Sequence, residues 1–308
     1  MTPSTPPRPL ALVGPTASGK SELAMRVAEA LGNIEIVSAD SMQVYREMDV
    51  GTAKPAPAEQ AAVRHHLIDI ADPSEPWDVA CFTSAAARAL ADIEARGRRA
   101  LFVGGTGLYM HAVVDGFQLP GQWPTLRAEL DAESTDDLCR RLASLDPAAA
   151  SRIEPGNRRR LLRALEVTLG SGRPFSGYGP GVGAFPLTRW RLAGVWLSRQ
   201  VVAARVERRF AAMMSAGFLD EVKRLAARPG GLSRTARQAL GYRELLAHLE
   251  LGLSLDDAVS LSVRRTVRFS RRQRMWWRRD PRVRWFGASE NPLEILPALL
   301  GNWRRERL

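Results

Sequence analysis

One short stretch near the start of the chain restricts the possible folds more than any other feature. The residues GPTASGKS, Gly14 to Ser21, match the pattern G-x-x-x-x-G-K-[ST]. The apolar run 9–13 comes before them, and after them Leu23, Val27 and Leu31 recur at helical spacing. A strand, a glycine loop and a helix in this order form a phosphate-binding loop, because the loop N–H groups and the helix N-terminus face an anion.

The loop predicts how an anion is held, although it leaves open which phosphate compound binds. Gly14 and Gly19 let the backbone fold around the anion, and Lys20 supplies a positive charge to the outer phosphate. The hydroxyl of Ser21 is the expected protein ligand of Mg²⁺. The complete predicted anion-binding set is the run Gly14, Pro15, Thr16, Ala17, Ser18, Gly19, Lys20 and Ser21.

Strands and helices alternate after this loop. NIEIVSADS predicts a second strand that ends at Asp40, and residues 100–103 predict a third that ends in two glycines before Thr106. An alanine-rich helix, residues 81–96, precedes that third strand. This alternation predicts an α/β fold, a P-loop nucleoside-triphosphatase-like parallel sheet flanked by helices. Ligands bind beyond the carboxyl ends of such strands, so we expect the loop, Asp40 and Thr106 to converge on one cleft.

The pattern changes beyond residue 117. LPGQWP resembles a linker, residues 124–170 predict helices only, and the next clear strand is RWRLAGVWL at 189–197. We therefore predict a catalytic core formed by 8–118 plus 186–308 and a helical insertion domain at 119–185. The proline-rich residues 1–7 are expected to be disordered.

The charge of the chain favours a polyanionic partner. Lys and Arg number 44 against 33 Asp and Glu, which gives a net charge of +11. An arginine-rich composition typical of a GC-rich genome is the alternative reading, but residues 264–284 hold ten Arg and one Asp. Trp276 and Trp277 lie among these arginines, where they could stack on unpaired bases or pack in the core. Arg159 and Arg163, on a helix that Asn157 can cap, form a second basic edge.

Several classes of protein are disfavoured. No apolar run approaches the roughly 18 residues of a membrane span, and the start lacks the apolar stretch of a signal peptide. Cys81 and Cys139 lack metal-site spacing, so we interpret them as buried thiols of a cytoplasmic protein. The adjacent histidines of HHLID, residues 65–69, do not share a face, which favours polar packing near the cleft over metal binding.

Asp40 has two possible roles at this stage. ATPases with this loop usually place a Mg²⁺-binding Asp at the end of an apolar strand. Here the strand LFVGG ends in glycines, whereas Asp40 follows the other strand. Asp40 could therefore be a metal ligand or a base, and the departure from the ATPase layout weakens an assignment to ATP.

Seven motifs occur along the chain in a fixed order: GPTASGKS, ADSMQVYREMDVGTAKP, HHLIDI, VGGTGLY, RRRLLRALEV, ALGYRE and RRQRMWW. Together they resemble the tRNA dimethylallyltransferase family from about Pro9 to about Arg284. The resemblance implies transfer of a dimethylallyl group from dimethylallyl diphosphate to N6, the exocyclic amine, of the adenosine beside the anticodon on its 3′ side. The base must leave the stack to react. The resemblance also implies a monomer, with Mg²⁺ as cofactor.

The resemblance further implies roles for individual residues. Asp40 is the implied general base that takes a proton from the amine, and Thr106 is implied to hydrogen-bond the bridging oxygen of the diphosphate. Arg205 matches a family arginine that reaches the diphosphate, and Arg209 is a weaker candidate. Met275 stands where family members often have threonine, so a hydroxyl contact is lost there.

The implied tRNA contacts lie on four stretches, on Thr106 and on one residue of the insertion. The helices of the insertion are implied to grip the anticodon stem. The implied contacts are Asp40, Ser41, Met42, Gln43, Thr106, Arg127, Arg159, Arg160, Leu161, Leu162, Arg163, Gln238, Gly241, Tyr242, Arg243, Arg271, Arg272, Gln273, Arg274, Trp276 and Arg278.

Two other functions compete with this one. A small-molecule or nucleotide kinase would use the same loop with ATP, and lid arginines would explain part of the basic charge. It leaves the ordered motifs of the second half unexplained, and it expects a Mg²⁺-binding Asp after a strand. A non-catalytic RNA-binding module with a relic loop is the third candidate, and the pairing of Asp40 with Thr106 at strand ends argues against it.

Overall fold

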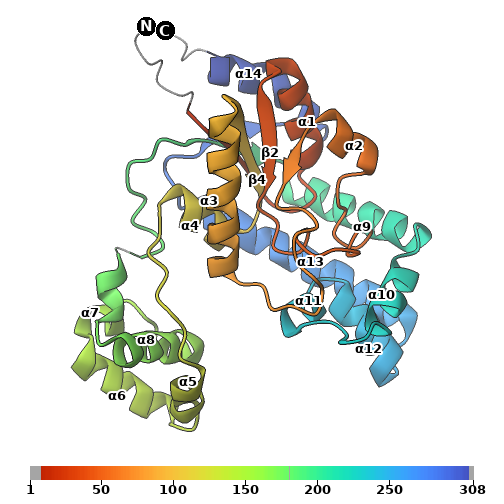
Figure 1. The fold of residues 1–308 in the computed structure, drawn as a ribbon. Coiled ribbons are helices and arrows are strands. Elements are labelled where there is room, and N and C mark those ends of the chain that lie inside the picture. Colours follow the sequence, from red (N-terminus) through yellow and green to blue (C-terminus); the bar gives the residue numbers. More distant parts are fainter. Residues whose placement is uncertain (1–7, 180, 305–308) are drawn as a thin grey trace, which may run out of the picture. The chain divides into compact units, whose positions relative to one another are not determined.

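A parallel sheet of six strands forms the centre of the larger part of the molecule (Figure 1). The computed structural model describes residues 8–179 and 181–304, so the predicted disorder of residues 1–7 lies outside the described residues. All the strand pairs are parallel, in the order β3-β2-β4-β1-β5-β6. The strands are β1 (Leu10–Val13), β2 (Ile34–Ser38), β3 (His65–His66), β4 (Arg99–Gly104), β5 (Arg191–Trp196) and β6 (Arg284–Gly287). The predicted α/β fold is confirmed.

The central strands are apolar because both faces of the sheet are covered. Successive residues of β1 point to opposite faces, so Leu10 and Leu12 pack in one core cluster and Ala11 and Val13 in another. The first cluster lies under α1 (Lys20–Leu31) and α14 (Leu296–Arg304), and the second under α3 (Val79–Ala95) and α4 (Gly107–Val114). The sheet therefore lies between two helical layers, and its carboxyl edge is left for a ligand.

A third core cluster lies among the helices between β5 and β6. Val206 and Phe210 of α9 (Arg199–Ser215) pack there against Phe218 of α10 (Phe218–Ala226) and Tyr242 of α12 (Tyr242–Leu251). Three short helices complete the larger part of the molecule: α2 (Pro57–Ala62) lies between β2 and β3 along the chain, α11 (Arg234–Arg237) precedes α12, and η2 (Pro292–Ile295) precedes α14. The longest helix, α13 (Leu255–Trp277), contains most of the arginine-rich segment. The predicted mostly helical character after residue 198 is confirmed, apart from β6.

The chain divides into two compact units, of which the second runs from Asp115 to Pro186. This unit holds α5 (Pro124–Asp131), α6 (Thr135–Leu145), α7 (Pro147–Ala150), α8 (Arg158–Ser171) and η1 (Phe175–Tyr178), and no strand among its described residues. Asn157 caps α8 as predicted, because its Oδ1 accepts a hydrogen bond from Arg160 N. Leu161 and Leu162 of α8 are buried in the unit's own core.

Both cysteines lie on helices, and neither is fully buried. Cys81 is exposed in the first turn of α3 and Cys139 is partly exposed in α6, so the interpretation of both as buried thiols is wrong. Neighbouring positions on a helix can be buried or exposed, and the spacing of two cysteines along the chain does not predict which of these a cysteine will be. Within the described parts of the chain, no helix is both long and apolar enough to cross a membrane.

Candidate active site

A cleft of about 1100 Å³ opens at the carboxyl ends of three neighbouring strands. The phosphate loop follows β1, Asp40 follows β2 and Thr106 follows β4, and the sheet places these strands side by side in the order β2-β4-β1. All three segments line the cleft. The predicted convergence is confirmed, and it follows directly from the parallel topology.

The phosphate loop has a conformation that its glycines make possible. Gly19 at the N-terminus of α1 has φ 81°, in the left-handed region, and a Cβ there would lie 2.2 Å from Pro292 Cγ. Two distant helices brace the loop. Thr16 N donates to Gln273 Oε1 of α13 at 2.8 Å, and Arg205 Nε of α9 donates to Ala17 O, also at 2.8 Å. The loop is thus held in shape by side chains from the second half of the chain.

The polar side chains of the loop suit an anion. Lys20 Nζ lies inside the loop and donates to Pro15 O at 2.6 Å. Burial lowers the pKa of Lys20 to about 7, the Asp40 carboxylate opposes this shift, and the Arg209 guanidinium adds to it. Ser18 Oγ is buried and has no hydrogen-bond partner among the described residues. A buried lysine that lines the cleft, within a glycine loop at a helix N-terminus, is a feature of a site that an anion completes.

Asp40 is half-buried and sits in a tight turn at the end of β2. Its Oδ1 accepts a hydrogen bond from Met42 N at 2.8 Å, and its N–H donates to Ser38 Oγ at 3.3 Å. Thr106 is also half-buried, and its carbonyl accepts from Met110 N in the first turn of α4. These local bonds fix the backbone at both strand ends, and both residues line the cleft.

Arginines form one wall of the cleft. Arg205, Arg208 and Arg209 come from α9, and Arg268 and Arg272 come from α13. Arg209 Nη2 donates to Thr52 O at 3.2 Å. Burial lowers the pKa of Arg209, and the Asp40 carboxylate opposes that shift. Five arginines therefore outnumber the three acidic residues that line the cleft, Glu22, Asp40 and Glu59, which favours a ligand that carries several negative charges.

The residues expected to contact tRNA fall into two groups in the structure. The first group reaches the surface: Gln238, Arg243, Arg271, Arg272 and Arg278 in the larger unit, and Arg159 and Arg160 in the second unit, are exposed, while Ser41 and Met42 are half-buried at the cleft. These side chains have access to a large partner.

The second group has partners inside the protein. Burial corrects the expectation of tRNA contact for Arg274 and Gly241, whereas Gln273 and Tyr242 also line the cleft and their contact stays a prediction. Gln273 binds the phosphate loop, Arg274 donates to Leu197 O and lies 4.4 Å from the centre of the Trp196 ring, and Tyr242 donates to Glu221 at 2.6 Å. Trp276 is partly buried in the core and donates to His111 Nδ1 at 2.9 Å, while Trp277 is fully buried. Gly241, which takes φ 88°, is buried against Phe218.

Internal partners are also found for four residues of the second unit and for Gln43, which lines the cleft. Leu161 and Leu162 are core residues. Arg127 and Arg163 both pair with the buried Glu166 carboxylate, at 3.0 and 2.9 Å. Gln43 is buried and hydrogen-bonds Ser38, Thr52 and Ala53. Burial corrects the expectation for Leu161 and Leu162. For Arg127, whose side chain is 40% exposed, for Arg163 and for Gln43, contact with tRNA stays a prediction.

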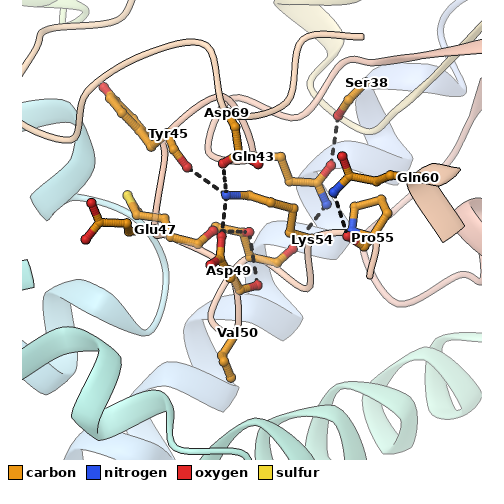
Figure 2. A network of polar contacts seen from close by, with 12 residues as sticks. Ser38, Gln43, Tyr45, Glu47, Asp49, Val50, Lys54, Pro55, Gln60 and Asp69 are labelled. Carbon is orange, nitrogen blue, oxygen red and sulfur yellow. Dashed lines mark hydrogen bonds and ion pairs between the residues drawn. The ribbon is translucent and has the colours of Figure 1, made fainter. Parts of the chain in front are cut away.

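Sequence reasoning assigned no role to Lys54, which also lines the cleft. Its side chain is 4% exposed and is the centre of a polar network with Asp49, Asp69 and the carbonyl of Tyr45 (Figure 2). The only signal for it was its place in the quoted GTAKP motif. Lys54 ties together two segments that are 15 residues apart.

The paired histidines have structural partners. His66 Nε2 lies 2.7 Å from Glu35 Oε2, and His65 Nδ1 lies 2.7 Å from Val63 O. The described residues contain no group of three or more His, Cys, Asp or Glu side chains that could hold a metal ion. The expectation of polar packing for HHLID is confirmed.

Comparison with known proteins gives consistent matches over nearly the whole chain. A family model described as IPP transferase matches residues 43–280, and one described as isopentenyl transferase matches residues 8–72. A tRNA dimethylallyltransferase of Acidothermus cellulolyticus is 46% identical over 97% of this chain and 95% of its own length. One from Roseiflexus sp. is 45% identical over 92% of this chain and 94% of its own.

Solved structures agree with these sequence matches. The full-length tRNA isopentenylpyrophosphate transferase of Bacillus halodurans has a TM-score of 0.70 and 36% identity, covering 97% of each chain. A eukaryotic dimethylallyltransferase acting on tRNA has a TM-score of 0.78 over 92% of this chain and 74% of its own, and at 23% identity it supports the fold alone. By its fold, its motifs and these matches, the chain belongs to the tRNA dimethylallyltransferase family.

Proposed function

We propose that this protein transfers a dimethylallyl group from dimethylallyl diphosphate to N6 of the adenosine that follows the anticodon on its 3′ side in tRNA. One observation carries the proposal: a phosphate loop, the Asp40 carboxylate and Thr106 meet in one cleft with an arginine wall. A kinase is not favoured, because the apolar strand β4 runs into Gly104, Gly105 and Thr106 instead of a Mg²⁺-binding Asp.

The diphosphate of the donor is the expected ligand of the loop. The loop at the N-terminus of α1 and the Lys20 ammonium both line the cleft, and both suit its oxygens. The Arg205 guanidinium lies against the loop, because its Nε binds Ala17 O and its Nη2 is 3.3 Å from the place where a Cβ on Gly19 would be. These groups bind a leaving group, and none of them has to deliver a phosphoryl group.

A divalent cation fits the same place, and we propose Mg²⁺. Ser21 is exposed at the first turn of α1, where its hydroxyl can serve as one protein ligand. The described residues provide no cage of acidic side chains, which suits an ion that is bound mainly through water and substrate phosphates. When bound, the cation neutralises charge on the departing diphosphate.

Asp40 is proposed to act on the attacking amine, and Thr106 on the leaving diphosphate. The N6 amine attacks the first carbon of the prenyl group, the C–O bond to the diphosphate breaks, and its electron pair leaves with the diphosphate. Asp40 accepts the proton that the amine loses, since an arylamine is a weak nucleophile without a base in reach. Thr106 donates a hydrogen bond to the bridging oxygen, where negative charge grows in the transition state.

Proton uptake on diphosphate binding tests the role of Lys20. A free Lys20 with a pKa of about 7 is largely neutral at pH 8 and largely charged at pH 6. An anion against it raises that pKa, so binding at pH 8 should take up as much as about one proton more than binding at pH 6. Calorimetry with inorganic diphosphate in buffers of different ionisation enthalpy measures this difference. In Lys20→Arg the guanidinium is always charged, so the extra uptake should vanish. Equal uptake in both proteins at pH 8 would contradict the assignment.

The exposed arginines of α13 are expected to contact the tRNA backbone. Replacing Arg271 and Arg272 with Ala should weaken tRNA binding and reduce the slope of log K against log salt by about two. Replacing Arg88 and Arg224 removes the same charge from side chains that do not line the cleft, and it should leave the slope near the wild-type value. A titration of binding against salt checks both. An unchanged slope in the first variant would mean that Arg271 and Arg272 stay exposed to water and do not contact phosphates of the tRNA. Arg159 and Arg160 of the second unit are proposed to add further contacts to the anticodon stem.

The proposed activity is tested by incubating the protein with dimethylallyl diphosphate, Mg²⁺ and unmodified tRNA, followed by digestion to nucleosides. N6-isopentenyladenosine is the expected product. Consumption of ATP without any prenylated nucleoside would instead favour the kinase. A monomeric state and a cytoplasmic location remain predictions from the sequence.

A further inference from the structure

A loop without regular secondary structure forms part of the cleft wall. Residues 51–55 line the cleft and belong to a segment, 43–55, of turns and irregular backbone with one isolated bridge at Tyr45. A loop of this kind is normally mobile, because its own backbone bonds are few. Buried polar side chains hold it here, and they come from distant parts of the chain.

The strongest of these contacts comes from Glu221 of α10, which is only 1% exposed. Its Oε2 accepts hydrogen bonds from Asp49 N and Val50 N at 2.9 and 2.7 Å. Its Oε1 accepts from Gly51 N at 3.1 Å and from the Tyr242 hydroxyl at 2.6 Å. One buried carboxylate therefore satisfies three consecutive backbone N–H groups and a phenol.

This arrangement requires a carboxylate. A buried charge is costly unless several donors surround it, and successive backbone N–H groups form a concave site for an anion. Burial and the Glu221 charge raise the pKa of Tyr242 well above its usual range, so its hydroxyl remains a donor. A carboxamide in the same place has one acceptor oxygen instead of two, and its NH₂ group would face donors.

Packing leaves the anchored loop little room. A Cβ on Gly51 would lie 2.1 Å from Phe218 Cε2 and 2.6 Å from Tyr242 Cε2. The backbone of the loop is therefore in direct contact with α10 and α12. Hydrogen bonds to Glu221 and ring contacts at Gly51 together fix the position of this part of the loop backbone in the cleft wall.

Hydrogen bonds connect the anchored loop to the end of β2. Gln43 Nε2 donates to Thr52 O and Ala53 O at 3.3 and 3.2 Å, and its Oε1 accepts from Ser38 Oγ at 2.9 Å (Figure 2). Ser38 Oγ also accepts from Asp40 N. The connection thus runs from α10 through the loop to the turn that carries the Asp40 carboxylate.

We infer that Glu221 is a positioning residue for the acceptor side of the reaction. This inference rests on the proposed function. Glu221 does not line the cleft, so it acts through the loop and through Asp40 and does not touch substrate. The phosphate loop has separate braces, Gln273 and Arg205, and among the described residues only Arg209, which donates to Thr52 O, connects the anchored loop with the cationic wall by a hydrogen bond. We therefore expect Glu221 to affect the acceptor side much more than diphosphate binding.

The test compares Glu221→Gln with Glu35→Gln. Glu35 is also a buried carboxylate that does not line the cleft, with Arg96 and His66 both at 2.7 Å, but it lies near the amino end of β2 and has no bond to the loop 43–55. In Glu221→Gln, kcat for prenyl transfer to tRNA should fall about 10- to 100-fold, while the Kd for inorganic diphosphate stays within about twofold. Hydrogen exchange at the amides of residues 49–51 should become faster. Glu35→Gln should leave kcat, the Kd for diphosphate and hydrogen exchange at residues 49–51 unchanged.

A milder variant keeps the test informative if Glu221→Gln folds poorly. Tyr242→Phe removes one of the four donors and leaves the carboxylate charged, so it should lower kcat by a smaller factor with the same unchanged diphosphate binding. The inference is overturned if folded Glu221→Gln has wild-type kcat, if diphosphate binding falls in parallel with kcat, or if exchange at residues 49–51 is unchanged. If the wild-type protein transfers no dimethylallyl group to tRNA, the proposed function fails instead, and the exchange data still test the anchor.

Discussion

Replacing Asp40 with Asn is expected to lower kcat for prenyl transfer by about 10²- to 10⁴-fold, the usual contribution of a positioned base. The amide cannot accept the proton from N6, but its Oδ1 can still accept the hydrogen bond from Met42 N that shapes the turn. Binding of inorganic diphosphate should therefore remain at the wild-type level. Single-turnover transfer to tRNA and calorimetric titration with diphosphate measure the two quantities separately.

The same variant distinguishes the two roles that the sequence left open for Asp40. A base is needed only when the amine attacks, whereas a metal ligand is needed whenever the diphosphate binds with its cation. Parallel loss of diphosphate and Mg²⁺ binding would show that Asp40 is a metal ligand. Normal turnover would remove it from the mechanism.

Removing the hydroxyl of Thr106 should have the second largest effect. Thr106→Val keeps the branched shape but cannot donate to the bridging oxygen, and kcat should fall about 10²- to 10³-fold, as for other donors aimed at developing charge. Thr106→Ser keeps the hydroxyl and should stay within about tenfold of wild type. Because Met110 N binds the carbonyl of residue 106, both variants can retain the start of α4. Equal activity of the two variants would show that the hydroxyl has no part in the step.

The parts of the fold that could be predicted are those in which one local signal dominates. β1, β2, β4 and β5 are buried apolar runs, and glycines or polar residues mark their ends, so both the strands and the convergence of Asp40 with Thr106 followed from the sequence. β3 has only two residues, and β6 begins at an exposed arginine at the edge of the sheet. Neither strand has an apolar run that could reveal it.

The parts of the site that could not be predicted depend on long-range contacts. Glu221 meets Asp49 across 172 positions of the chain, and Gln273 meets Thr16 across 257. No local pattern contains such a pairing. Resemblance to a family transfers a position along the chain but not the direction of a side chain, which is why Leu161 and Arg274 were expected at the tRNA and are found in the interior.

The phosphate loop holds the group that departs, in this account, and does not transfer a phosphoryl group. The most direct measurement is the stoichiometry of products in one reaction that contains the protein, dimethylallyl diphosphate, ATP, Mg²⁺ and unmodified tRNA. We expect one inorganic diphosphate to be released for each N6-isopentenyladenosine formed, with ATP unchanged. ADP formation without diphosphate release, or diphosphate release without modified adenosine, would contradict this expectation.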